Sequence, residues 1–416
     1  MAQQSCPAQG SARAALMPPL PVGKHANVVF LAQQSDSSLL QRYDVTTGAT
    51  QTILQINQEE SVLGASVSPD GQWVLFGALL QDQSAIQLVR MDGQQLQTLY
   101  CAPAQTNVNN LVLSPDQHYL VFNQVNSDES ASILYLLDMR TGKLQTELAT
   151  LQPNYPVFGQ GLAQTSSMPL LTSSFSQHKA SDSLPARPFN PLPSKHYPIY
   201  IPMKWATNSS IYLLGRLIAT PSPPPQLVLL RDISKDVTQQ GSNLQPIVVT
   251  PETNNCQDVD VTPDSQQVVC SSYIQFGTGN PSSILMQPTT GGAFRSVYRN
   301  AAGGSLTARA FSDSTIIFIL YRQNAPPALF KINSDGGGLT QLMAAPTTKT
   351  LLNITVSGSS YLPWSIASRD GTLYALQLYD LTTDKQSLIF GSVSGGMPKT
   401  ITSSSNQLAV VGWTEI

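Results

Sequence analysis

The segment SVSPDGQWVLF, residues 66–76, decides the fold of this 416-residue chain. It joins a short apolar strand, a Ser-Pro-Asp-Gly turn and a second strand rich in apolar residues. Similar segments follow at 111–122, LVLSPDQHYLVF, and at 260–270, DVTPDSQQVVC. Two weaker copies are KWATNSSIYLL, residues 204–214, and RAFSDSTIIFIL, residues 309–320. The recurrence of one hairpin along the chain predicts a repeat architecture.

A second motif recurs between these hairpins, an apolar strand that ends in a turn rich in Asp, Thr and Gly, as in IQLVRMDG and ALFKINSDGG. A further short strand such as QLQTLY or GLTQLM follows it. The seven copies close at Gly48, Gly93, Gly142, Asp236, Gly291, Gly336 and Asp384. By subtraction these residues lie 45 to 55 apart, except for one gap of 94. Each unit therefore supplies four short strands, which is one blade of a β-propeller.

We predict an all-β fold, a seven-bladed β-propeller of four-stranded antiparallel blades over residues 26–416, with six or eight blades as alternatives. Residues 1–25 are predicted to be an N-terminal linker or tail, and the long gap holds a Pro/Ser-rich insertion at about 151–196. The first repeat lacks its own first strand, and the segment near 400–413 has the pattern of the missing piece. We expect this C-terminal strand to join the N-terminal blade, since closure removes the exposed edges of an open sheet.

The segments SPDGQWVLF, IQLVRMDG and ALFKINSDGGGLTQL resemble the TolB-type propeller repeat, a relative of the WD repeat. The resemblance covers nearly all of residues 26–416 and implies the propeller fold. TolB itself has six blades and an extra N-terminal domain, whereas this chain has seven repeat lines and no such domain. The opening CPAQGSARAALMPPL and the Gln/Ser-rich propeller resemble, more weakly, the extracytoplasmic sensor propellers of bacterial membrane serine/threonine kinases.

The composition bears on partners and location. The net charge of −3 argues against a nucleic-acid partner, which favours a basic surface. Charged residues make up 11% of the chain, so neutral polar residues supply most of the polar surface, as in many exported proteins. No apolar run approaches the roughly 18 residues of a membrane span, and the start carries no signal-peptide pattern. We expect an extracytoplasmic protein, secreted or at the cell surface, tethered to a membrane by a preceding segment.

The four cysteines allow three disulfide connectivities. Cys256 and Cys270 flank a Thr-Pro-Asp-Ser turn that would bring them onto neighbouring strands, which leaves Cys6 and Cys101 as the other pair. Four free thiols are the alternative. Zinc is not expected, because the chain has neither C-x-x-C nor H-x-x-x-H spacing.

Charged residues on the first strands of three repeats are the candidate axial-mouth binding site. Asp260 lies two residues before the Thr of its turn, and Asp258 two further back points the same way. Lys204 takes the matching place in the preceding repeat, and Arg309 lies in the following one. An ion pair between blades is the simplest role for these residues, and ligand binding is the alternative.

The two faces of the ring are expected to differ. Turns within SPDG, MDGQ, RTGK and SDGG are tight and share one face. The other face carries LLQDQSA, NSDESAS, IATPSPPPQ, YIQFGTGNPSS, YRQNAPPA and the insertion, and long connections on a rigid scaffold commonly bind ligands. The candidate loop contacts on this face are Tyr155, Phe158, Tyr273, Phe276 and Tyr321.

Catalytic motifs are absent from the sequence. The string Gly391–Gly395 has Val393 where the G-x-S-x-G nucleophile motif requires serine. The turn residues Asp70, Asp116 and Asp264 are expected to bond their own turn backbones rather than calcium. We therefore expect no cofactor and a non-catalytic, ligand-sensing or protein-interaction propeller whose partner is a protein, peptide or glycan. The alternatives are an enzyme acting on a polysaccharide or small ester in the axial pocket, and an assembly scaffold.

Overall fold

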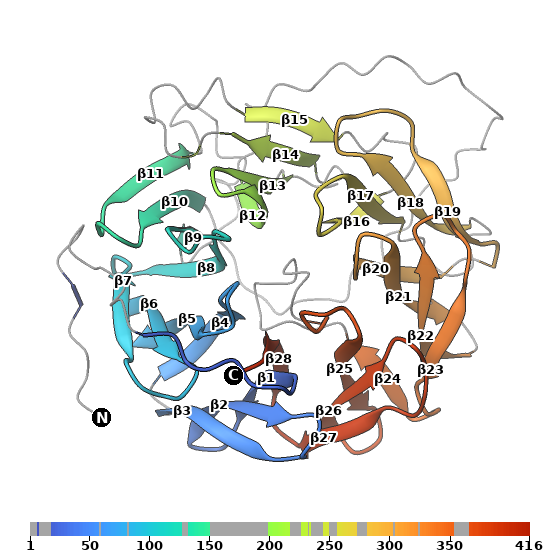
Figure 1. The fold of residues 1–416 in the computed structure, drawn as a ribbon, viewed down its shortest axis with the longest axis horizontal. Helices are drawn as coiled ribbons and strands as arrows, with labels where there is room; N and C mark the ends of the chain where they lie inside the picture. The colour runs from blue at the N-terminus through green and yellow to red at the C-terminus, as the bar shows by residue number, and fades with distance from the viewer. Residues whose placement is uncertain are drawn as a thin grey trace, which may run out of the picture.

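In the residues that it describes, the computed structural model shows 28 strands in seven four-stranded antiparallel sheets, arranged as blades around a common axis (Figure 1). The predicted seven-bladed propeller is confirmed, and the alternatives of six or eight blades are wrong. The residues that the structure describes are 6–7, 18–57, 60–80, 83–126, 132–149, 199–216, 226–231, 233, 244–248, 256–272, 281–302, 304–322, 325–352 and 366–416.

Each blade is given from its innermost to its outermost strand. Blade one consists of β28 (Leu408–Thr414), β1 (Asn27–Gln33), β2 (Ser37–Asp44) and β3 (Thr50–Asn57). Blade two consists of β4 (Glu60–Val67), β5 (Trp73–Leu80), β6 (Gln83–Arg90) and β7 (Gln97–Cys101). Blade three consists of β8 (Thr106–Leu113), β9 (Tyr119–Asn126), β10 (Ser132–Asp138) and β11 (Leu144–Ala149).

The remaining blades repeat the same order. Blade four consists of β12 (Ile199–Thr207), β13 (Ser210–Arg216), β14 (Gln226–Leu230) and β15 (Leu244–Val248). Blade five consists of β16 (Cys256–Val261), β17 (Gln267–Ser272), β18 (Ser282–Pro288) and β19 (Arg295–Asn300). Blade six consists of β20 (Ser305–Ala310), β21 (Thr315–Arg322), β22 (Ala325–Asn333) and β23 (Thr340–Ala344). Blade seven consists of β24 (Lys349–Leu352), β25 (Leu373–Asp380), β26 (Lys385–Ser392) and β27 (Lys399–Ser404).

The core is divided among the junctions between blades. The buried apolar side chains form seven clusters, and each cluster lies between two neighbouring blades. On β5, Val74 and Phe76 pack toward blade one, whereas Leu75 between them packs toward blade three. Successive side chains of a strand point to opposite faces of its sheet, so an apolar run on a middle strand covers both neighbours.

The turn that ends the third strand of a blade requires a left-handed backbone. Gly93 has φ of +82°, and a Cβ there would lie 2.4 Å from the Ile53 carbonyl oxygen of the neighbouring blade. Glycine meets both demands because it has no side chain. The described closing residues of the repeat all have positive φ, namely Gly48, Gly93, Gly142, Gly291, Gly336 and Asp384.

The ring closes in blade one, where strands from the two halves of the sequence meet. Strand β28 pairs antiparallel with β1, from Asn27 opposite Thr414 to Ala32 opposite Leu408. The predicted closing strand is confirmed, and it is the innermost strand of the blade. Its predicted start was wrong, since 399–404 form β27, the outermost strand of blade seven.

Two of the connections expected to be long are short. The middle strands β5 and β6 are separated only by residues 81–82, and β21 and β22 only by residues 323–324. Most of LLQDQSA and YRQNAPPA is therefore strand: Leu80 pairs with Gln83 across one hairpin and Arg322 with Ala325 across the other. The insertion at 151–196 and the segments 127–131, 217–225 and 273–280 lie outside the described residues.

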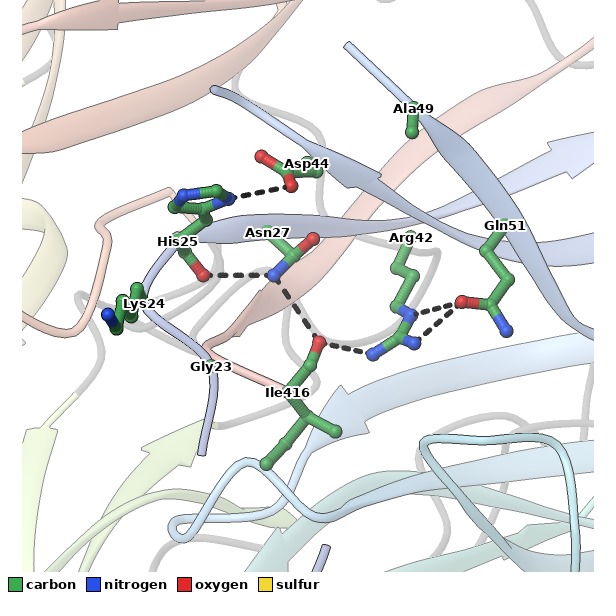
Figure 2. A pocket seen from close by; sticks show the side chains of 9 residues that line it. All are labelled: Gly23, Lys24, His25, Asn27, Arg42, Asp44, Ala49, Gln51 and Ile416. Atoms are coloured by element: carbon green, nitrogen blue, oxygen red, sulfur yellow. Dashed lines mark hydrogen bonds and ion pairs between the residues drawn. The ribbon is translucent and has the colours of Figure 1, made fainter. Parts of the chain in front are cut away.

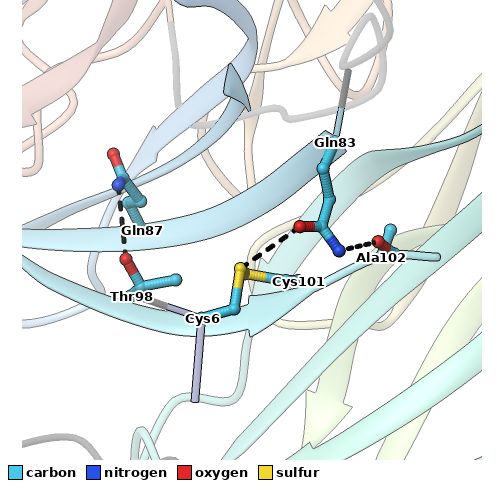
Figure 3. Close-up of a disulfide and its surroundings, with 6 residues drawn as sticks. All are labelled: Cys6, Gln83, Gln87, Thr98, Cys101 and Ala102. Atoms are coloured by element: carbon cyan, nitrogen blue, oxygen red, sulfur yellow. Dashed lines mark hydrogen bonds between the residues drawn. A yellow bond between two sulfur atoms is a disulfide. The ribbon is translucent and has the colours of Figure 1, made fainter. Parts of the chain in front are cut away.

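Part of the predicted tail is bound to the propeller. The backbone of Leu20 exchanges two hydrogen bonds with the Gln72 side-chain amide, at 2.7 and 3.2 Å. Cys6 forms a disulfide with Cys101 on the outermost strand of blade two (Figure 3). The expected pairing of these two cysteines is confirmed.

Cys270 is also disulfide-bonded, and no described cysteine is free. The alternative of four free thiols is therefore wrong. The one other cysteine of the chain is Cys256, whose side chain lies outside the described part of the structure.

Candidate functional site

Three charged side chains occupy the inner strands of consecutive blades. Lys204 lies on β12, Asp260 on β16 and Arg309 on β20. Their exposed fractions are only 6%, 2% and 7%. These residues form the charged inner row, which runs across blades four, five and six.

Asp260 links two neighbouring blades through its carboxylate. Its Oδ1 accepts a hydrogen bond of 2.8 Å from the backbone N–H of Val261. Its Oδ2 accepts one of 2.9 Å from the backbone N–H of Ala310, on the inner strand of blade six. Both carboxylate oxygens are therefore engaged by backbone.

The two basic residues of the row also bond backbone. Lys204 Nζ donates to the carbonyl oxygens of Thr262, at 2.6 Å, and Val261, at 3.3 Å, in blade five. Arg309 Nη1 donates to the carbonyl of Ala308 at 2.8 Å. Lys204 thus joins blade four to blade five, as Asp260 joins blade five to blade six.

Burial shifts the titration of this row toward neutral pH. Burial raises the pKa of Asp260 to about 6, against the opposing effect of Arg309 and Lys204. Burial lowers the pKa of Lys204 to about 8, against the opposing effect of Asp260, Asp313 and Asp264. Burial thus disfavours the charged form of both groups, and the opposite charge of each favours the charged form of the other.

This arrangement joins neighbouring blades. The two Asp260 oxygens accept hydrogen bonds from backbone N–H groups of blades five and six, which fix the carboxylate at the junction between them. Within the described residues, no group of three or more His, Cys, Asp or Glu side chains is placed to hold a metal ion. The side chain of Asp258 lies outside the described part.

The loop residues predicted from sequence fall mostly outside the described chain, namely Tyr155, Phe158, Tyr273 and Phe276. Tyr321 is described and lies near the end of β21, half-buried. Its hydroxyl donates to the backbone carbonyl of Leu351 in blade seven, and burial raises its pKa to about 12. It therefore packs between blades six and seven.

The Asp residues of the first turns bond their own turns, as predicted. Asp70 Oδ1 accepts from the Ser68 hydroxyl at 2.6 Å and from the Gln72 backbone N–H at 3.0 Å. Asp116 and Asp264 repeat this pattern. Ser368-Arg369-Asp370-Gly371 in blade seven is a further copy that the sequence reading missed.

A pocket with a volume of about 230 Å³ opens where the ring closes. We call it the seam pocket (Figure 2), and its lining residues are Gly23, Lys24, His25, Asn27, Arg42, Asp44, Ala49, Gln51 and Ile416. It lies beside the turn that joins β2 to β3, on the face of the tight turns. The sequence reading missed it, since it assigned residues up to 25 to a tail.

The acidic group of the seam pocket is fully bonded. Asp44 Oδ2 lies 3.0 Å from His25 Nδ1, and Oδ1 accepts from the backbone N–H groups of Thr46 and Thr47 at 2.8 and 3.1 Å. Burial alone would raise the pKa of Asp44, but the hydrogen bonds from His25, Thr47 and Thr46 outweigh it and lower the pKa to about 2.

The basic group of the seam pocket is held in place by Gln51 and Ile416. Arg42 donates from Nε and Nη2 to Gln51 Oε1, at 3.1 and 2.6 Å, and from Nη1 to the backbone oxygen of Ile416. Asn27 Nδ2 donates to the same Ile416 oxygen at 3.3 Å. Burial lowers the pKa of Arg42, against the opposing effect of Asp92 and Asp44.

Comparison with solved structures places the chain among propellers of low sequence identity. The β-propeller domain of the trilobed protease from Pyrococcus furiosus matches with a TM-score of 0.53 and 10% identity, over 92% of this chain and 97% of that chain. Oligopeptidase B from Leishmania major matches with a TM-score of 0.53 and 11% identity, over 98% of this chain and 50% of that chain.

TolB from Acinetobacter baumannii is also similar, with a TM-score of 0.43 and 11% identity, over 76% of this chain and 63% of that chain. This chain is thus a β-propeller in fold, and likeness at such identities describes the fold alone. It spans half of the oligopeptidase and less than two thirds of that TolB chain. No protein-family model matches the chain, and no curated protein matches its sequence.

The described residues include no helix with the length and apolar character of a membrane span.

Proposed function

We propose that this protein is a non-catalytic, extracytoplasmic binding module that recognises a protein, peptide or glycan. The observation that carries the proposal is the bonding of the charged inner row. Lys204 and Asp260 are the buried polar groups best placed for axial chemistry, and both bond the backbone of a neighbouring blade. Because backbone groups bond these central charges, the connections between blades are the surface that we propose for binding the partner.

The disulfides support the extracytoplasmic part of the proposal. Disulfides persist in oxidising compartments and are rare in the reducing cytosol. Cys6–Cys101 joins residues 95 positions apart, and Cys270 is bonded as well. Thiol alkylation of the native protein, without and with prior reduction, tests this directly. We expect no labelled cysteine before reduction and four after it, and labelling before reduction would contradict the proposal.

The binding role can be tested with arrays of immobilised glycans and peptides, probed with the labelled protein. The test variant has residues 157–193 replaced by a short Gly-Ser linker, and the matched control is Lys143→Gln on a tight turn of the opposite face. We expect wild type and control to bind the same array members and the linker variant to lose them at an unchanged melting temperature. Equal binding by all three would remove the insertion from the proposed site.

Catalysis is the second candidate, and the peptidases among the structural matches favour it. Oligopeptidase B aligns with this chain over half of its own length. Hydrolysis of p-nitrophenyl acetate and of 4-methylumbelliferyl glycosides by wild type and Asp260→Asn separates the candidates. We expect no turnover above the buffer rate. Turnover that is lost in a folded Asp260→Asn protein would establish an enzyme instead.

A further inference from the structure

The segment PPLPVG, residues 18–23, precedes β1 and lies against blade two and the end of the closing strand (Figure 1). It forms neither helix nor strand. Because proline has no backbone N–H, Leu20 carries the one N–H of residues 18–21. Proline also restricts the backbone to an extended conformation, so a stretch of this kind loses little entropy when it binds.

The side-chain amide of Gln72 binds both backbone groups of Leu20. Its Oε1 accepts from the Leu20 N–H at 2.7 Å, and its Nε2 donates to the Leu20 carbonyl at 3.2 Å. The backbone of Gln72 is itself fixed, since its N–H donates to Asp70 Oδ1 at 3.0 Å and its carbonyl accepts from the Met91 N–H at 2.7 Å. The amide is therefore held in place to bind the single N–H of a proline-rich segment.

The role of Gln72 differs from that of its counterparts in other blades. Gln72 is the fifth residue of its turn, counted from Ser68, and is 6% exposed. In three other described turns the side chain of the fifth residue bonds its own turn: Gln266 to the Asp264 carbonyl at 3.4 Å, His118 to Asp116 at 3.0 Å and Thr372 to Asp370 at 2.7 Å. The position thus binds another segment in blade two without being required to do so by the turn.

The segment is held as a docked peptide would be. Leu20 is half-buried and packs against the apolar cluster between blades one and two, whereas Pro18, Pro19 and Pro21 are exposed. Arg90, which is 9% exposed, donates from Nη1 to the Pro18 carbonyl at 3.5 Å. One apolar side chain and two stretches of backbone therefore make the contacts.

We propose that Gln72, Arg90 and the apolar surface under Leu20 form a binding site for a proline-rich segment of a partner protein, with the pattern Pro-Leu-Pro. Residues 18–21 occupy this site as an internal competitor. They are attached on one side to β1 and on the other through the Cys6–Cys101 disulfide, which keeps their effective concentration high. The site lies on the face of the tight turns and is separate from the connections proposed above to bind the partner.

Fluorescence anisotropy of the peptide PPLPVGK, labelled on its lysine, tests the proposal by titration with the full chain. In Leu20→Asp the charged side chain leaves the apolar surface and empties the site. We expect saturable binding to this variant, and binding weaker by about tenfold or more to wild type, where residues 18–21 compete. Adding Gln72→Ala to Leu20→Asp should raise the dissociation constant by about 30-fold, the effect of two hydrogen bonds. The matched control, Gln266→Ala in the same background, should leave it unchanged.

A second peptide, with N-methyl-leucine in place of leucine, lacks the N–H that Gln72 accepts and should bind about tenfold more weakly or less. Absence of saturable binding to Leu20→Asp overturns the site, as does equal binding of the two peptides or unchanged binding after Gln72→Ala. If Leu20→Asp loses its cooperative urea transition, Leu20→Gly takes its place. The array experiment above measures the effect of the insertion and this titration measures that of Gln72, so the two proposals fail independently.

Discussion

The seam of blade one and the charged inner row of blades four to six hold their blades together in different ways. In the inner row the charges are buried and bond backbone groups across the junction, as Lys204 does to Thr262. At the seam the strands themselves pair, and the charged groups lie nearer to solvent around a pocket. In both regions the charged groups bond backbone, so the contrast lies in burial: the inner row is shielded from water, whereas the charged groups of the seam stay partly exposed.

The largest effect should come from removing the seam. Deleting 408–416 strips β28 from blade one, where Leu408, Val410 and Trp413 are at most 3% exposed. Truncating one such side chain costs about 2–5 kcal/mol, and a typical domain is stable by about 5–15 kcal/mol. We expect the deletion to abolish the cooperative urea transition. Met397→Ala, at a 94% exposed position, should leave it unchanged, and a cooperative transition in the deletion variant would contradict a closed ring.

Breaking the charged inner row should have the next largest effect. Asp260→Ala leaves Lys204 and Arg309 buried without their shared carboxylate and frees two backbone N–H groups. Removing one partner of a buried charge set costs about 3–5 kcal/mol. Urea denaturation measures this loss in the free energy of unfolding, and Asp36→Ala at an exposed turn is the control. A loss below about 1 kcal/mol would show that the row does not join the blades.

The disulfide of the tail should contribute less. Cys6→Ser with Cys101→Ser opens a covalent loop of 95 residues and is expected to lower the free energy of unfolding by about 2–4 kcal/mol. The double variant is preferable to a reductant, because reduction also breaks the disulfide of Cys270. An unchanged free energy of unfolding in urea would show that the disulfide is not needed to keep residues 18–23 bound to the propeller.

The smallest effect is the response of the seam to acid. The folded pKa of Asp44, about 2, lies below its ordinary value of 3.8, so its stabilisation is present above pH 3.8 and disappears as the pH falls through 2. Between pH 5 and pH 2 wild type should lose about 1 kcal/mol more than Asp44→Asn, because solvent screens a partly exposed carboxylate. Asp36→Asn controls for the loss of one negative charge. If the free energy of unfolding falls equally with pH in wild type and Asp44→Asn, the bonds from His25, Thr46 and Thr47 do not stabilise the seam.

The sequence predicted the features that depend on neighbours along the chain. The Ser-Pro-Asp turns and the glycines that close the third strands were readable because each demands a particular residue at one position. The turn at 368–371 was not predicted. It lacks the proline of the other Ser-Pro-Asp turns, and the inner strand that precedes it, β24, ends at Leu352, far from the turn in sequence. The connections at 81–82 and 323–324 were predicted too long, because polar residues in a hairpin resemble a loop until their partners are known.

By itself the sequence determined the class of fold, the number of blades and the strand that closes the ring, since a repeat of four short strands buries its apolar faces only by stacking against further copies. Only the tertiary structure decided which charges are buried against backbone and which surround the seam pocket. Arg42 meets Ile416 across 374 residues of chain, and Lys204 meets Thr262 in another blade. Solvent exposure and bonding depend on distances between remote strands, and no local pattern of residues encodes those distances.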